Sequence, residues 1–308
     1  MADISRDDAA GLLADQNINE ILQDAAQSSA SLATFRTIRM GTQITKMPIL
    51  TALPTASWVD GDDGQKSTDD QIWAKKTLTA EELAVIVPIP ENVFDDTEFG
   101  VWEEVRPRIA EAIGKALDSA VFFGNGAPAS LDPSLYEGAL TSGQVYGVGD
   151  STVDLAEDIN QTWGLVEAVG FDVNTQYASR RIRMSLRGLR DDNNQPIYLE
   201  SLRSDGVDRS IGGVDLTFVQ NGAWDDDVTL IAGDATKAIL GIRQDVTYKI
   251  LTEATLTDGS GNVTVSLAEQ DMIALRAKFR VGFVVANTVS SETGSQEYPF
   301  AVLSVTGS

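Results

Sequence analysis

The 308-residue sequence contains no cysteine and no histidine. Without cysteine, the chain cannot form a disulfide bond, bind zinc through thiolates or attack a substrate with a thiol. Without histidine, it lacks the side chain that most often transfers protons near neutral pH and most often binds metals. These two absences exclude most familiar catalytic and metal-binding constellations.

Long hydrophobic runs are also missing. No segment approaches the roughly 18 consecutive apolar residues that a membrane-spanning helix needs. The first residues, MADISRDDAAGLL, have neither the basic start nor the apolar block of a signal peptide. We therefore expect no membrane segment and synthesis in the cytoplasm.

Basic residues are scarce. The chain has 23 Lys and Arg against 46 Asp and Glu, a formal net charge of -23. Such a negative field repels nucleic acid and anionic lipid at long range, which disfavours a general DNA-binding role. The acidity is consistent either with solubility and salt adaptation or with a function of the negative surface.

With thiol and imidazole chemistry excluded, catalysis would depend on carboxylates, lysines, hydroxyls or a metal. The paired acids are adjacent in sequence, so their side chains diverge and do not form an acid/base pair; they are Glu81-Glu82, Asp95-Asp96 and Glu103-Glu104. Asp60 opens an acidic segment, but Gln65 and Gln71 stand where a calcium loop needs Gly and Glu. No phosphate-binding loop or Gly-x-Ser-x-Gly motif is present. We predict no catalytic residue, no cofactor and no metal site.

The chain does contain enough apolar residues for a substantial core. Hydrophobic residues make up 43% of the sequence, and the length suits one large domain or two ordinary ones. Helical and strand-like periodicities both occur, so the predicted class is α+β.

Residues 1–46 are predicted to form an N-terminal arm. The first thirty residues carry six acids and one base. A short helix in this segment has a narrow apolar face made of Ile18, Ile21, Leu22 and Ala25. We expect this face to dock on another element or subunit, with packing on its own domain as the alternative.

Residues 47–83 favour a long hairpin. Two apolar limbs flank the acidic tip WVDGDDG, which begins at Trp58, and the returning limb contains Trp73. Gly61 and Gly64 give the tip the backbone freedom of a turn. Because an isolated two-stranded hairpin is only marginally stable, this ribbon is expected to lie on another surface; a plain surface loop is the alternative.

A strand and a long helix follow. Residues 83–89, LAVIVPI, are predicted as a strand with Pro88 near its end. Asp95 and Asp96 can cap an amphipathic helix over about residues 98–123, and Gly124 ends the helical run. Pro107 falls inside this helix, so a kink or a later start is expected there.

A second domain is predicted from residue 151. Before it, residues 131–150 are rich in Gly and Ser and are interpreted as a connector. The patterns then predict helices at 155–169, 179–190 and 268–276. They predict strands at 172–178, within 206–219 and 230–250, and at 279–286 and 298–305. A polar turn is predicted at 191–196 and a hairpin loop at 258–262.

Four arginines form the one concentrated basic feature: Arg180, Arg183, Arg187 and Arg190. Their spacing places them on one side of the predicted helix. Guanidinium groups bind carboxylates and phosphates in paired hydrogen bonds. On so acidic a chain we expect carboxylates of a neighbouring copy as partners, with intrachain pairing or solvation as the alternative.

The order of these features resembles the major capsid proteins of tailed bacteriophages, which share the fold named after phage Hong Kong 97. The resemblance is carried by Trp73–Pro128, Leu230–Ile250 (LIAGDATKAILGIRQDVTYKI) and Asp271–Asn287 (DMIALRAKFRVGFVVAN). It implies an N-terminal arm over 1–46, an extended β-hairpin loop over 47–83, a peripheral domain over 84–150 and 277–308 that contains the long spine helix, and an axial domain over 151–276.

The resemblance also implies a function. It implies a structural, non-enzymatic protein that self-assembles as pentamers and hexamers into an icosahedral head, which encloses DNA without sequence-specific binding. The expected location is the virion capsid, after assembly in the host cytoplasm. The expected partners are a separate scaffolding protein, a portal and, as a further candidate, a decoration protein. A negative wall suits a shell that must hold DNA without adhering to it.

In the resembling proteins the extended loop reaches across a neighbouring subunit. The candidate intersubunit contacts are therefore Trp58, Asp60, Asp62, Asp63, Lys66, Trp73, Arg180, Arg183, Arg187 and Arg190. Some members seal the shell with an isopeptide bond between a loop lysine and an asparagine. Lys66, Lys75 or Lys76 and Asn287 are only nominal counterparts here, so we expect no cross-link; the nominal pair is Lys66 and Asn287.

Three other functions stay open from the sequence. An encapsulin, a bacterial compartment of the same fold, is the nearest alternative, although the arginine-rich segment and GDATKAILGIRQD favour a phage protein. A secreted or surface binding module is disfavoured by the absence of an export signal. A carboxylate-based hydrolase comes last.

Overall fold

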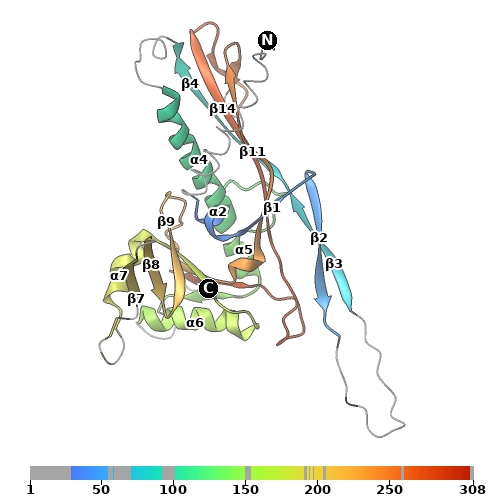
Figure 1. Cartoon of the computed structure of the whole chain (residues 1–308), viewed down its shortest axis with the longest axis vertical. Coiled ribbons are helices and arrows are strands. Elements are labelled where there is room, and N and C mark those ends of the chain that lie inside the picture. Colours follow the sequence, from blue (N-terminus) through green and yellow to red (C-terminus); the bar gives the residue numbers. More distant parts are fainter. Residues whose placement is uncertain are drawn as a thin grey trace, which may run out of the picture.

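The fold was analysed in a computed structural model. The structure describes residues 29–54, 58, 71–91, 101–149, 154–190, 193, 195–196, 198–203, 206–257 and 260–305. The chain is a mixture of helices and strands, and it is drawn out along one axis (Figure 1). The predicted helix around Ile18 and Ala25 and the caps Asp95 and Asp96 lie outside the described residues.

A tall four-stranded sheet forms one end of the molecule. Its order is β1 (Arg36–Arg39), β11 (Ala238–Leu251), β14 (Met272–Val285) and β4 (Glu81–Pro90). Helix α4 (Val101–Phe123) runs alongside this sheet (Figure 1). Alternate side chains of β14, among them Ala277, Phe279 and Val281, share a core with the apolar side of α4.

A seven-stranded sheet forms the other large layer. Its order is β5 (Val145–Gly147), β15 (Phe300–Ser304), β10 (Val228–Gly233), β6 (Thr175–Ser179), β9 (Val214–Val219), β8 (Gly206–Ile211) and β7 (Tyr198–Arg203). Helix α6 (Leu155–Ala168) packs on it through Ile159 and Trp163. Helix α5 (Leu135–Thr141) lies between α4 and β15, so it links the two layers.

One core joins both sheets. Five aromatic rings, those of Phe35, Phe122, Tyr177, Trp224 and Phe283, pack in stacked, tilted and edge-to-face contacts with centroids 5.1 to 6.1 Å apart. They come from both sheets, from α4, from the chain beside α2 (Ala30–Thr34) and from the loop between β9 and β10. This packing fixes the sheets relative to each other.

The hairpin leaves this body as two paired strands. Strands β2 (Ile44–Ala52) and β3 (Ile72–Thr79) are antiparallel, with Ile44 opposite Thr79 and Leu50 opposite Trp73. They extend downward and away from the sheets (Figure 1). The limbs predicted as a hairpin are therefore paired, although the pairing begins at residue 44 instead of 47.

Several predicted elements are confirmed. Strand β4, helix α6, strand β6 and strand β15 all occupy the predicted segments with slightly different ends. Helix α4 starts six residues before Pro107 and continues through it, so the later start is wrong. Val105 and Ile109, on either side of the proline, pack against the core and hold this first part of the helix.

Three predictions are wrong. Residues 268–276 are not a helix: residues from Met272 onward belong to β14, which pairs with both β4 and β11. The connector at 131–150 contains α5, and the capping box of Ser134 and Glu137 starts this helix although Gly138 lies inside it. The connector also contains β5. The helix at 179–190 is a 3-10 turn, η1 (Arg180–Ile182), followed by the short α7 (Arg183–Gly188).

The sheets also cross the predicted boundary between domains. Strand β11 falls within 151–276 but pairs with β14 and β1 in the four-stranded sheet. Strand β15 falls within 277–308 but pairs with β10 and β5 in the seven-stranded sheet. Residue 276 itself lies inside β14. Distant strand pairing, which local patterns do not reveal, causes both differences.

Candidate interaction surfaces

The hairpin presents apolar side chains to solvent. Ile44, Ile72 and Trp73 are each more than half exposed, and Trp58 has no protection at all, at 103% of its reference area. Large exposed apolar groups on one protruding element are typical of surfaces that bind other molecules. Asp60, Asp62, Asp63 and Lys66, the other predicted contacts of this loop, lie outside the described residues.

The base of the hairpin is anchored by a close crossing over the four-stranded sheet. Leu78 and Met40 are buried against Ile239 and Val284 on the sheet face away from α4. Gly241 and Gly282 are cross-strand partners beneath them. A Cβ on Gly282 would lie 2.3 Å from the Thr79 carbonyl oxygen. The glycine pair thus creates the space in which the hairpin crosses the sheet.

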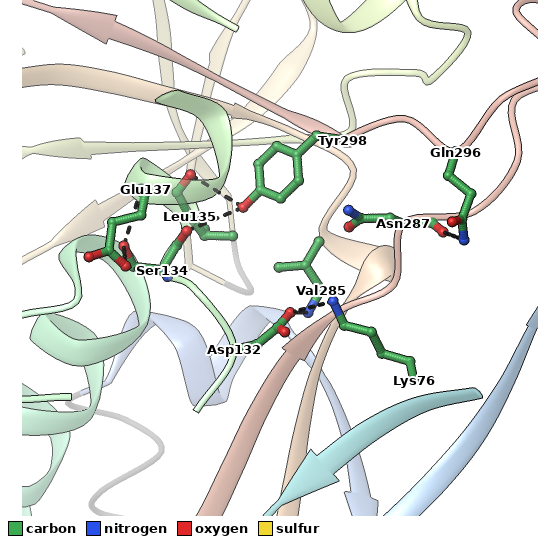
Figure 2. Close-up of polar contacts among 9 residues, drawn as sticks. All are labelled: Lys76, Asp132, Ser134, Leu135, Glu137, Val285, Asn287, Gln296 and Tyr298. Carbon is green, nitrogen blue, oxygen red and sulfur yellow. Dashed lines mark hydrogen bonds and ion pairs between the residues drawn. The ribbon is translucent and has the colours of Figure 1, made fainter. Parts of the chain in front are cut away.

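A polar cluster ties this base to the body (Figure 2). The Lys76 ammonium lies 2.9 Å from the Asp132 carboxylate, and the same carboxylate accepts a hydrogen bond from the Val285 N–H at 3.2 Å. Lys76 is therefore engaged within its own chain, whereas Lys75 is exposed on β3. One ion pair links the hairpin to the loop before α5, and one hydrogen bond links that loop to β14.

Asn287 lies next to this cluster (Figure 2). Its backbone carbonyl accepts a hydrogen bond from the Gln296 side chain at 3.0 Å. Its own amide oxygen is buried, and within the described part of the chain no donor reaches it. Because Lys66 lies outside the described residues, the nominal pair of Lys66 and Asn287 stays a sequence-based suggestion.

Tyr298 is hydrogen-bonded to the start of α5. Its hydroxyl lies 3.4 and 3.3 Å from the carbonyl oxygens of Ser134 and Leu135. Burial raises the pKa of Tyr298 well above its ordinary value, and the nearby carboxylates of Asp132 and Glu137 raise it further. The phenol therefore stays neutral and acts as a hydrogen-bond donor.

The four predicted arginines do not lie on one helix. Arg180 is in η1 and contacts Gln220, Arg183 and Arg187 are in α7, and Arg190 lies beyond it in an isolated bridge with Pro196. The Arg190 guanidinium donates to the carbonyl oxygens of Arg187 and Leu189, at the C-terminal end of α7. Arg183 and Arg187 are also engaged within the chain. The segment stays strongly basic, but it is not a straight stripe.

A buried carboxylate network escaped the sequence analysis. Asp118 of α4 is fully buried and accepts hydrogen bonds from Ser29, Ala30, Ser31 and Asn221 at distances of 2.5 to 3.1 Å. It joins the start of α2 to α4 and to the loop after β9. One sequence signal could have revealed it: Asp118 is an acidic residue on the apolar side of the helix, which also carries Leu117 and Val121.

Among the described residues, no group of three or more acidic residues is close enough to hold a metal ion. None of the described helices is long and apolar enough to cross a membrane. The features that stand out are surfaces suited to contact with other chains.

Comparison with known proteins gives a consistent result. Residues 10–290 match the model of the phage capsid family. A curated relative, the major capsid protein of Staphylococcus phage 80alpha, is 29% identical over 282 residues, which cover 90% of this chain and 82% of the relative.

Solved structures agree along the whole chain. A structure from Microbacterium phage Oxtober96 is 47% identical, with a TM-score of 0.78, and the match covers 98% of this chain and 99% of that one. A structure from Mycobacterium phage Bobi is 38% identical, with a TM-score of 0.76 and full coverage of both chains.

Proposed function

Because the chain belongs to the phage capsid family and serves as a phage major capsid protein, we propose that its copies are held together in the shell by the hairpin β2–β3. The observation that carries this proposal is the set of exposed apolar side chains on the hairpin, led by Trp73 and Trp58. In a monomer they cost free energy, whereas a neighbouring copy can bury them.

The two sheets suggest how a copy is divided. In this proposal, the four-stranded sheet with α4 as the spine helix is the peripheral domain, and the seven-stranded sheet with α6 is the axial domain near the capsomer centre. Residues 1–46 act as the arm, whose strand β1 adds an edge to the four-stranded sheet, and residues 47–83 act as the extended loop, which leads into β4. Pentamers and hexamers then form through repeated contacts between unlike surfaces of one chain.

We assign no catalytic role to the chain. A scaffolding protein, a portal and a decoration protein are proposed partners, and assembly is proposed to take place in the host cytoplasm before the protein becomes part of the virion. The encapsulin alternative finds no support among the relatives described above, which come from phages.

Replacing the two exposed tryptophans tests the role of the hairpin. We expect Trp58→Ser with Trp73→Ser to leave the unassembled chain as stable as before, within about 0.5 kcal/mol, because neither ring is in a core. Particle yield, measured by sedimentation and negative-stain microscopy, should fall strongly. Val263→Ser, at a 64% exposed position on β13 (Val263–Ser266), is the matched control. Normal particle yield from the double variant would contradict the proposal.

A further inference from the structure

The four-stranded sheet carries a row of basic side chains on the face away from α4. Side chains alternate between the two faces of a strand, and those of β14 at 275, 277, 279 and 281 enter the core shared with α4. The residues between them therefore lie on the opposite face. Lys249 of β11 is the cross-strand partner of Arg276 on that face. The basic row consists of Arg276, Lys278, Arg280 and Lys249.

This row is unusual in so acidic a chain. Alternate residues of a strand lie about 7 Å apart, so the three cations of β14 form a continuous line. Arg276 and Lys249 are directly opposed like charges, an arrangement that is unfavourable in an isolated sheet. Glu82 of β4, which pairs with the Lys278 ammonium, compensates only one of the four charges. The row thus carries a net positive charge on a chain of net charge -23.

The arginines of the row also have unused donors. The Nε atoms of Arg276 and Arg280 are buried, and no acceptor within the described residues reaches them. Buried donors without acceptors are rare in folded proteins because each one costs its hydration. Because these Nε atoms are themselves buried, an acidic partner that binds on this face would offset the charge of the row, and it would reach the two donors only if the arginine side chains rearranged.

We propose that the basic row receives the acidic hairpin tip, residues 58–64, of a second copy of this chain. The inference rests on the proposed role of the hairpin and names its docking site. The tip, WVDGDDG, contains three carboxylates, Asp60, Asp62 and Asp63, and no base. Carboxylates accept paired hydrogen bonds from guanidinium groups, and the exposed ring of Trp58 can stack on an arginine.

Within one copy, strands β2 and β3 extend away from the basic row. The hairpin crosses β14 at Gly282 and then extends away from the sheet, whereas the row occupies β14 on the other side of that crossing (Figure 1). Strand pairing agrees, because positions 276 to 280 of β14 lie beside β4, whereas β3 ends at Thr79, next to Gly282. Docking is therefore between copies.

Two other occupants fit less well. The acidic N-terminal segment is predicted from its sequence to carry an apolar helical stripe, and such a stripe would need an apolar groove instead of a row of cations. DNA phosphates could pair with the row, but the strong negative charge of the rest of the chain opposes the approach of DNA. Both alternatives become outcomes of the experiments.

The first experiment is a charge exchange. We expect Arg276→Glu with Arg280→Glu to lose particles, Asp62→Lys with Asp63→Lys to lose them as well, and the fourfold variant to regain them. Arg108→Glu is the matched control, since Arg108 is an exposed cation of α4 on the opposite side of the sheet. If the fourfold variant fails although all unassembled chains fold by circular dichroism, the row does not receive the tip.

The second experiment uses the absence of native cysteine. Assembled particles of Asp62→Cys with Lys278→Cys are treated with a short bis-maleimide and analysed on denaturing gels. We expect a ladder of covalent multimers, and no ladder from the control Asp62→Cys with Arg108→Cys. Monomer bands alone, or bridges only within one chain, overturn the inference.

The outcomes separate the competing explanations. If Trp58→Ser with Trp73→Ser assembles normally, the proposed role of the hairpin is wrong, and the inference is wrong with it. If that variant loses particles but the fourfold charge exchange does not restore them, only the docking site is wrong. A contact between the row and DNA would give three results. Arg276→Glu with Arg280→Glu would form particles normally, the unassembled chain of this variant would be retained more weakly on immobilised DNA, and Asp62→Cys with Lys278→Cys would give no cross-links. These results together would show that the inference is wrong. The same cysteine experiment with Asp8→Cys in place of Asp62→Cys identifies the N-terminal segment as the occupant if only that pair gives multimers.

Discussion

At the scale of single residues, Asp118 is the clearest anchor in the molecule. Its two oxygens accept from two backbone N–H groups, two serine hydroxyls and one amide, the longest at 3.1 Å. A buried carboxylate is tolerated only when such donors replace its hydration. The network holds the first described residues, from Ser29 onward, against α4.

Removing this carboxylate should destabilise the chain severely. We expect Asp118→Ala to lower the free energy of unfolding by roughly 3 kcal/mol or more, because several buried donors lose their acceptor together. The measurement is denaturant unfolding of the unassembled chain. Glu111→Ala, at an exposed position of the same helix, should change the stability by no more than about 0.5 kcal/mol. Equal effects of the two substitutions would show that the network is not an anchor.

At the scale of elements, the crossing of the hairpin over the sheet depends on two glycines. Gly282 faces the backbone of β3, which cannot move without the whole strand. Gly241 instead faces the ends of the Leu78 and Met40 side chains, which can adopt other rotamers. A side chain at position 282 would therefore meet a rigid neighbour, whereas one at position 241 would meet flexible neighbours.

This difference predicts unequal effects of the same substitution. Gly282→Ala should lower the stability by about 1 to 3 kcal/mol and loosen the hairpin base, because the new methyl overlaps the Thr79 carbonyl. Gly241→Ala should cost less. Gly164→Ala in α6, where the new methyl meets nothing, should stabilise the chain by up to about 1 kcal/mol. Thermal unfolding and limited proteolysis of the hairpin measure all three, and a larger cost at Gly241 would refute this account of the crossing.

At the scale of the whole molecule, the shape separates a compact body from a protruding element. The body has a continuous core that joins both sheets through α4, whereas the hairpin is attached at its base by Leu78 and by the Lys76–Asp132 ion pair. The arginine-rich segment lies on the seven-stranded side, far along the chain from the hairpin (Figure 1). It is a second candidate contact between copies.

Charge reversal tests that second contact. We expect Arg183→Glu with Arg187→Glu to reduce particle formation while the unassembled chain still folds, as judged by circular dichroism and sedimentation. Arg181→Glu is a matched control, because the highly exposed Arg181 has a partner in Asp226 of its own chain. Since Arg183 and Arg187 are themselves engaged within the chain, a loss of folding in their variant would favour the intrachain role. Unchanged assembly would exclude a role between copies.

Local patterns were sufficient for much of this protein. The missing cysteine and histidine exclude thiol and imidazole chemistry wherever the chain folds. The hairpin limbs, β4, α4 and α6 have strong periodicity over many residues, and the family could be inferred from their order.

Contacts between distant residues had to come from the fold. The segment 268–276 has apolar residues that suit a short helix, but Leu275, Ala277, Phe279 and Val281 alternate, and pairing with β4 and β11 selects the strand. In the same way, the donors of Asp118 lie about ninety or a hundred positions away in sequence. The basic row appears only when β14 is placed beside β11 with its other face on α4. Such features depend on which strands become neighbours, and burial of a shared core sets this, not local propensity.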